Sequence, residues 1–236
     1  MSAALPYCGA APLPAELWER WNLDPLVIAG LIVAIWVGRS LGLRMTPWAA
    51  GIAILVAVFV SPLCALGSAL FAARVAHHVI LAGVAAPLLA LALPRTGGSV
   101  PRWAAIHALA FWLWHAPPIY AQALASDAVY WLMQATLLGS ALMFWRAVRG
   151  AAPPLAIAGL LATMVQMGLL GALLTFTTTP LYAWHGVTTQ AWGISQLADQ
   201  QLAGLIMWVI GGALYLATAL KVASRLISDP TRPARA

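Results

Sequence analysis

The chain has 236 residues, of which 63% are hydrophobic and only 8% are charged, and its formal net charge is +6. Ordinary soluble domains carry about 25% charged residues, so this chain has too little polar surface to cover itself in water. The composition therefore excludes a soluble globular domain and predicts a membrane protein. In such a protein the basic residues gather at the cytoplasmic membrane surface, and no nucleic-acid partner is expected.

Apolar stretches follow one another along the chain, and a membrane span needs about 20 mostly apolar residues. The first 24 residues lack the basic start and the apolar run of a secretory signal peptide, so we expect the first span to remain in the mature protein. The sequence shows no internal repeat, and we expect one all-α domain over residues 1–236, a bundle of seven transmembrane helices. The expected spans are 26–43, 47–63, 74–93, 103–116, 128–148, 155–178 and 200–222.

The basic residues are distributed unequally between the two sides of these spans. Arg20 and Arg74 are assigned to one side, and the other ten Lys and Arg residues are assigned to the opposite side. Because cytoplasmic loops carry the excess of positive charge, the side with ten is expected to be cytoplasmic. The N-terminal segment 1–24 is then outside, and the tail 223–236 is cytoplasmic and, with its two prolines, expected to be disordered. The ten are Arg39, Arg44, Arg95, Arg102, Arg146, Arg149, Lys221, Arg225, Arg232 and Arg235.

This topology brings four of the five histidines to the outer membrane face. His77 and His78 lie one turn into the third span, His115 ends the fourth span, and His185 lies in the polar loop after the sixth. His107 falls in the cytoplasmic half. Imidazole is the commonest metal-binding side chain and suits copper, zinc and iron. The convergence predicts a metal site, although each histidine taken singly is also explained as a polar residue at headgroup depth.

Other ligand types lie near this face. Met207 is two turns into the seventh span, and its thioether favours cuprous ion, although methionines also fill gaps in cores. Asp199, at the start of the same span, is a candidate to hold a ligating imidazole through its second N–H. Cys8 and Cys64 are both assigned to the outer side, where they either form a disulfide in an oxidising periplasm or remain free.

Four stretches occur in an order that carries a family resemblance: LFAARVAHHVILAGVAAPLLALALP, FWLWHAPPIY, TPLYAWH and DQQLAGLIMWVIGG, at 70–94, 111–120, 179–185 and 199–212. They resemble the polytopic CtaG family of cytochrome c oxidase assembly factors, and the opening WNLDPLVIAGL is similar too. The resemblance implies a multi-pass protein of the bacterial plasma membrane that is not an enzyme. It implies a role in maturation of haem–copper oxidase through copper, with oxidase subunits or a periplasmic copper chaperone as partners besides the lipid bilayer.

The histidine pattern of this family falls on His78, His115 and His185. Two positions depart from it, because Arg74 stands where a histidine is expected one turn before His78, and Gln134 stands where another is expected in the fifth span. A cation at Arg74 would oppose a nearby metal ion. Either His77, which stands where many members have glutamine, compensates for the loss, or the site is reduced.

The sequence also bears on other classes of function. A membrane protein of b-type haem, or a quinone-linked electron-transfer protein, could use His78 and His115 as axial ligands, and without a Cys-x-x-Cys-His motif only non-covalent haem is possible. An ion-coupled transporter is disfavoured because no Asp or Glu lies deep inside an expected span. A retinal protein is disfavoured because Lys221, the only lysine, lies at the end of a span. Hydrolysis has no His-Glu-x-x-His or Gly-x-Ser-x-Gly motif to support it.

Overall fold

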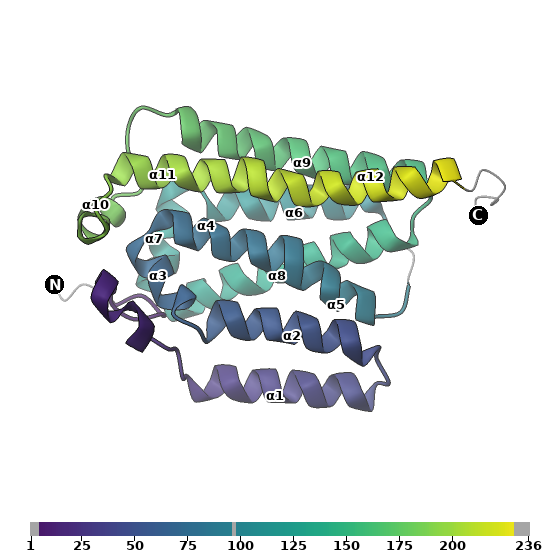
Figure 1. Cartoon of the computed structure of the whole chain (residues 1–236), viewed down its shortest axis with the longest axis horizontal. Helices are drawn as coiled ribbons and strands as arrows, with labels where there is room; N and C mark the ends of the chain where they lie inside the picture. The colour runs from purple at the N-terminus through teal and green to yellow at the C-terminus, as the bar shows by residue number, and fades with distance from the viewer. Residues whose placement is uncertain (1–4, 96–97, 229–236) are drawn as a thin grey trace.

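The computed structural model describes residues 5–95 and 98–228, and every element in that part of the chain is a helix. In chain order they are η1 (Pro14–Glu19), α1 (Pro25–Ser40), α2 (Met45–Phe59), α3 (Leu63–Ala69), α4 (Phe71–Ile80), η2 (Leu81–Ala85), α5 (Ala86–Ala92), α6 (Val100–Trp114), α7 (Pro117–Ala125), α8 (Asp127–Gly150), α9 (Pro153–Phe176), α10 (His185–Thr188), η3 (Gln190–Trp192), α11 (Gln196–Leu205), η4 (Ile206–Gly211) and α12 (Gly212–Ser228). The long helices lie side by side with their connections at two opposite ends (Figure 1). We call the end that holds α3, α7, α10 and the N-terminal segment the α10 end.

Four helical segments are long and apolar enough to cross a membrane, and a fifth is added if α2 and α3, which are bent by 42° at a short break, form one span. Helix α1 is a shorter apolar helix. Of the four, Phe71–Ala92 is the most enclosed, with 61% of its apolar 18-residue window buried against 44% for the next segment. The chain is therefore a multi-pass membrane protein with α4, η2 and α5 near its centre. The four segments are Phe71–Ala92, Asp127–Gly150, Pro153–Phe176 and Gln196–Leu226.

Local sequence signals explain where several helices begin. The Asp24 carboxylate accepts a hydrogen bond from the amide of Leu26 (2.8 Å), and Pro25 occupies the first helical position of α1. The Ser99 hydroxyl does the same for the amide of Arg102 at the start of α6 (3.3 Å). These side chains satisfy amides that a helix N-terminus leaves without partners.

The structure corrects two expected segments. The polar loop expected over 179–198 contains the short helices α10 and η3, and the expected tail at 223–236 begins as helix, because α12 continues to Ser228. The reason for the second error is that nothing before Pro230 interrupts the helix, and a proline disfavours helix in the residue before it. The remainder of the expected tail, 229–236, lies outside the described residues.

Two close helix contacts depend on glycine. The ring of Trp48 in α2 lies across Gly38 of α1, and its Nε1 donates to the carbonyl oxygen of Ala34 (2.9 Å). On the other side of the bundle α9 and α11 meet at Gly171 and Gly204, where a Cβ on Gly204 would lie 2.5 Å from the Gly171 carbonyl oxygen. Small residues allow such approach between membrane helices, so these glycines set the spacing of the helices.

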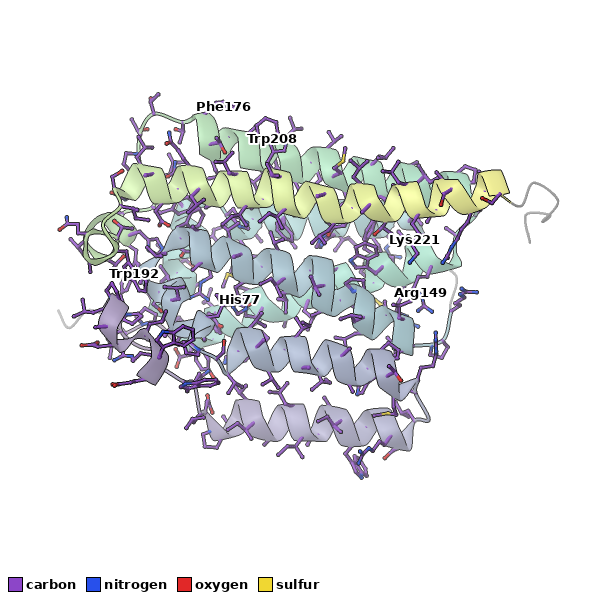
Figure 2. All side chains as sticks on the ribbon, viewed as in Figure 1. His77, Arg149, Phe176, Trp192, Trp208 and Lys221 are labelled. Atoms are coloured by element: carbon purple, nitrogen blue, oxygen red, sulfur yellow. A yellow bond between two sulfur atoms is a disulfide. The ribbon has the colours of Figure 1, made fainter. Side chains whose placement is uncertain are left out.

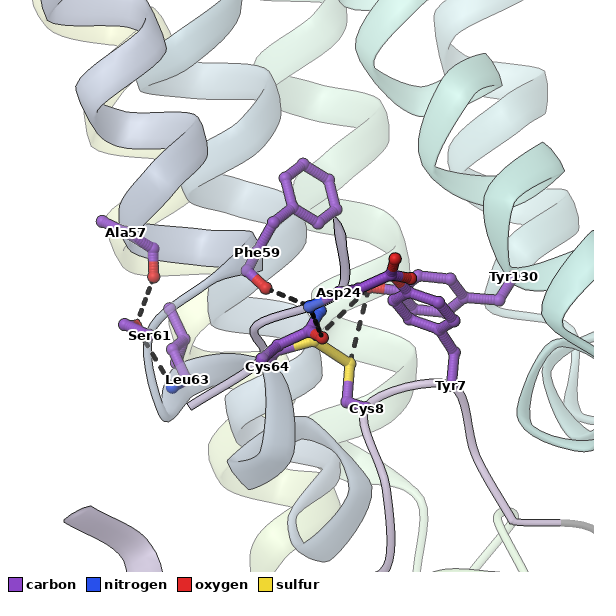
Figure 3. Close-up of a disulfide and its surroundings, with 10 residues drawn as sticks. Tyr7, Cys8, Asp24, Ala57, Phe59, Ser61, Leu63, Cys64 and Tyr130 are labelled. Atoms are coloured by element: carbon purple, nitrogen blue, oxygen red, sulfur yellow. Dashed lines mark hydrogen bonds between the residues drawn. A yellow bond between two sulfur atoms is a disulfide. The ribbon is translucent and has the colours of Figure 1, made fainter. Parts of the chain in front are cut away.

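A disulfide between Cys8 and Cys64 decides the alternative that the sequence left open. It ties the N-terminal segment to α3 at the α10 end (Figure 3). Beside it the ring of Tyr7 stacks on that of Tyr130 with centroids 4.8 Å apart, and the Tyr7 hydroxyl donates to the Asp24 carboxylate (2.5 Å). The N-terminal segment is therefore fastened over the α10 end of the bundle.

Candidate metal site

Helix α4 carries two histidines, and its start is held by a residue far away in the sequence. No side chain of its own caps this helix. Instead the buried Asp199 of α11 accepts hydrogen bonds from the backbone amides of Phe71 (2.7 Å) and Ala72 (3.0 Å). In this structure Asp199 acts as a helix cap, and no hydrogen bond joins it to an imidazole among the described residues. Both of its oxygens are taken by amides, because the unpaired N–H groups of a buried helix start need acceptors.

Three buried imidazoles form a row at the α10 end of the bundle. The ring centroids of His78 and His115 lie 5.4 Å apart with their planes nearly perpendicular, and those of His77 and His78 lie 5.9 Å apart. His77 lies near α2, where its ring meets that of Phe59 edge-on (Figure 2). We call His77, His78 and His115 the histidine row.

The nitrogens of the histidine row are not used by the protein. Neither nitrogen of His77 or His78, nor Nε2 of His115, makes a hydrogen bond to any described residue. The other nitrogen of His115, Nδ1, lies 2.7 Å from the carbonyl oxygen of Phe111, and because a carbonyl only accepts, this Nδ1 is the donor. The lone pair of His115 is therefore on Nε2, as in a metal-ligating histidine whose second nitrogen is anchored to the backbone.

The spacing of two rings in the row fits a shared ion. Two imidazoles that bind one ion at about 2 Å per nitrogen have centroids about 5 Å apart, which the separation of His78 and His115 matches. Within residues 5–95 and 98–228, however, no three His, Cys, Asp or Glu side chains are grouped so that they would hold a metal ion. The arrangement thus offers a pair of histidine ligands and not a closed site.

The structure does not bring His185 into the row. Its Nδ1 donates to the carbonyl oxygen of Ala69 (3.1 Å), and its Nε2 accepts from the hydroxyl of Tyr120 (2.8 Å). The ring of Phe71 stands beside it, 6.0 Å from His185 and 6.2 Å from His115. Both nitrogens of His185 are occupied, so this residue holds the α10 segment against α3 and α7.

The two positions that depart from the expected pattern lie in the same interior. Arg74, expected at the outer start of the third span, is 1% exposed and lies inside the bundle, because the span begins earlier, at Phe71. Its guanidinium packs against Gly67, where an added Cβ would lie 3.1 Å from Cζ, and stands 5.3 Å from the ring centroid of Tyr130. Gln134 is 2% exposed, and both of its amide atoms are without a hydrogen bond to the described residues.

Met207 and His107 lie deeper in the bundle than the histidine row. Met207 is fully buried in η4, a π-helical turn, eight residues and about 12 Å along the helix from Asp199. Of the histidines, His107 stands apart, with Nδ1 3.0 Å from the Ser140 hydroxyl and Nε2 3.3 Å from the Tyr215 hydroxyl. Because its nitrogens are paired, His107 serves the packing of α6, α8 and α12.

Comparison with known proteins decides the family. A family model described as cytochrome c oxidase caa3 assembly factor (Caa3_CtaG) matches residues 29–98 and 100–229. The chain belongs to this family. The match confirms the resemblance drawn from the four stretches, and it covers the histidine row, Arg74 and Gln134 but not Cys8. Neither the curated proteins nor the solved structures gave a match.

In this member of the family, several buried hydroxyl groups near Arg74 and His185 could not be identified from the sequence. Tyr120 holds His185, Tyr130 lies against Arg74, and the hydroxyl of Ser68 is buried without a hydrogen bond to a described residue. Tyr120 lies in one of the family-like stretches, and that was the one available signal. Tyr130 and Ser68 carry no such signal, because a tyrosine or serine near the end of a span is ordinary at a membrane interface.

The contacts of His185 predict a dependence of stability on pH. Burial lowers the pKa of His185 to about 4, against the partial opposition of its bond to Ala69, while an unfolded histidine titrates near 6.5. A group with a depressed pKa contributes stability that is present above its unfolded value and is lost as pH falls toward its folded value. Between pH 8 and pH 5 this loss is about 2 kcal/mol.

The measurement is the thermal midpoint of the assembly factor in detergent across that range, for the wild type and for His185→Asn, which cannot titrate. We expect the wild type to lose stability more steeply below pH 6.5. Because the other buried histidines are common to both proteins, only the difference between the two slopes reports His185. If the thermal midpoints of the two proteins fell equally steeply with pH, His185 would not be held neutral by its contacts.

Proposed function

We propose that this protein is a cytochrome c oxidase assembly factor of the bacterial plasma membrane that assists delivery or insertion of copper at the periplasmic face. Membership of the family supports the oxidase role. The observation that supports copper is the histidine row, in which five buried ring nitrogens have no partner among the described residues. Partners of this chemistry are a subunit of a haem–copper oxidase or a periplasmic copper chaperone. No reaction is proposed.

The proposed topology has seven spans, with the N-terminus outside and the C-terminus in the cytoplasm. It adds α1, α2 and α6, helices of 15 or 16 residues, to the four long segments. The burial of Arg74 leaves Arg20 as the one basic residue assigned to the outer side, which strengthens the charge bias. Arg149 and Lys221 lie at the end opposite to Trp192 (Figure 2), in keeping with this orientation.

Copper in this proposal is cargo and not a resident cofactor. The nitrogens of His78 and His115 suit both oxidation states of copper, and an imidazole site does not depend on the thiols that the disulfide occupies. A site with two neutral ligands holds an ion less firmly than a closed site with three or four. Weak holding suits a protein that passes its ion to an acceptor. His77, at the end of the row, is positioned as a further ligand during transfer.

The spacing of His78 and His115 does not favour the alternative that they are the axial ligands of a haem. Axial imidazoles about 2 Å from an iron on opposite faces of a macrocycle have centroids about 6 Å apart with the macrocycle between them. The rings of His78 and His115 are closer and contact each other edge to face. A purified protein without haem absorption would agree with this conclusion.

Oxidase activity in the native host tests the proposed role. Deletion of the gene is expected to lower haem–copper oxidase activity, most strongly under copper limitation, while oxidase transcript stays unchanged. Expression of the wild type or of His107→Ala should restore activity, and His78→Ala with His115→Ala should not. Full oxidase activity in the deletion strain at limiting copper would contradict the proposal.

A further inference from the structure

The guanidinium of Arg74 is a buried cation that makes no geometrically formed hydrogen bond or ion pair in the described part of the chain. Its three nitrogens are all buried and unpaired there. An arginine cannot escape this situation by losing its proton. Since an uncompensated charge inside a membrane protein is costly, such a residue needs either a counter-charge or a ligand.

The groups around Arg74 are neutral, and most of them carry hydrogen-bond donors. The hydroxyls of Tyr120 and Tyr130 lie close enough to interact with the guanidinium. Gly67 packs directly against the guanidinium, where an added Cβ would lie 3.1 Å from Cζ. Next to Gly67, the buried hydroxyl of Ser68 is unpaired within the described residues.

Further neutral polar groups around Arg74 come from α8 and from the histidines. Gln134 presents a buried amide without a partner among residues 5–95 and 98–228, one turn along α8 from Tyr130. The imidazoles of His77, His78 and His185 are also close enough to Arg74 to interact with its charge, and none of them carries a negative charge in any protonation state. Donors and a fixed positive charge are thus collected in one buried place.

The buried carboxylate of Asp199 does not satisfy Arg74. Asp199 uses its two carboxylate oxygens for the amides of Phe71 and Ala72, at 2.7 and 3.0 Å. No ion pair or hydrogen bond joins it to Arg74 in the described structure. Water molecules would satisfy the donors and would leave the local charge unbalanced.

We propose that Arg74 binds a small inorganic anion of halide size, together with donors from Ser68, Tyr130 and Gln134. A halide accepts hydrogen bonds from N–H and O–H groups in any direction, which suits donors that come from separate helices. Complete burial favours a small spherical ion over a larger oxyanion. This inference goes beyond the proposed copper role, although the two are compatible, because an anion at Arg74 would cancel the repulsion between this residue and a metal ion in the histidine row.

The test uses metal-free purified protein in detergent, titrated with bromide or chloride at constant ionic strength maintained with gluconate. A ligand that binds the folded state raises the thermal midpoint in a saturable way. We expect such a rise for the wild type and for Arg102→Gln, which makes the same change at an exposed arginine, and a flat response for Arg74→Gln. A flat wild-type response, or an equal rise in Arg74→Gln, would overturn the proposal.

A crystal of the wild type soaked in bromide provides a measurement that does not depend on the variant folding. We expect an anomalous peak within hydrogen-bond distance of the Arg74 guanidinium, and density for water alone at that position would overturn the proposal. Because no copper is present, failure of this test leaves the copper proposal standing. Failure of the copper test likewise leaves the anion site intact.

Discussion

Replacement of His78 and His115 by alanine is expected to lower the affinity of the purified protein for cuprous copper by about 100-fold or more. Loss of a group that only supports a ligand costs about 10–100-fold, and this double variant lacks both ligands. The two rings are the closest pair in the row, and each offers a nitrogen free of partners among the described residues. The measurement is a competition titration against a chromophoric cuprous chelator under reducing, anaerobic conditions.

His107→Ala is the matched control for this experiment. It removes a fully buried histidine from the helix that leads to His115, but one whose nitrogens face Ser140 and Tyr215. Its copper affinity is expected to equal that of the wild type even if its stability falls. Unchanged affinity in the double variant would show that the copper site lies elsewhere or does not exist.

The variant Gly204→Ala is expected to lower the free energy of unfolding by about 3 kcal/mol, at the upper end of overpacking costs. An added Cβ would overlap Thr175 Oγ1 and would lie 2.8 Å from the Thr175 backbone nitrogen. Because one of these contacts is with backbone, α9 and α11 would have to move apart. Asp199 is carried by α11, so the start of α4 and the histidine row are expected to shift with it.

Gly139→Ala provides the comparison, because a Cβ on Gly139 in α8 would meet nothing within 4 Å. The same substitution there is expected to stabilise the helix by about 0.5–1 kcal/mol through lower chain entropy. Thermal unfolding of the three proteins in one detergent measures both effects. A Gly204→Ala protein as stable as Gly139→Ala would contradict the close approach of α9 and α11.

The helices and the gathering of histidines at one end were predictable from sequence for simple physical reasons. Long apolar stretches in so uncharged a chain have to be membrane helices, and prolines mark several of their starts. Once alternate connections are assigned to opposite ends, histidines near the ends of spans converge. His77, His78 and His115 were placed together in this way.

The detailed partners depended on contacts that no local pattern shows. Asp199 caps a helix 128 positions earlier in the chain, and His185 bonds to Ala69 across 116 positions. Cys8 and Cys64 were assigned to one side, but only the packing of the N-terminal segment brings them together. Arg74 was expected at the outer start of the third span, and the structure buries it inside the bundle although arginine is costly there.

X-ray absorption at the copper edge of the copper-loaded wild type tests the central claim most directly. We expect two or three nitrogen neighbours at about 2 Å with the outer-shell scattering of imidazole. A spectrum with sulfur neighbours only, or without imidazole scattering, would contradict a site built from His78 and His115.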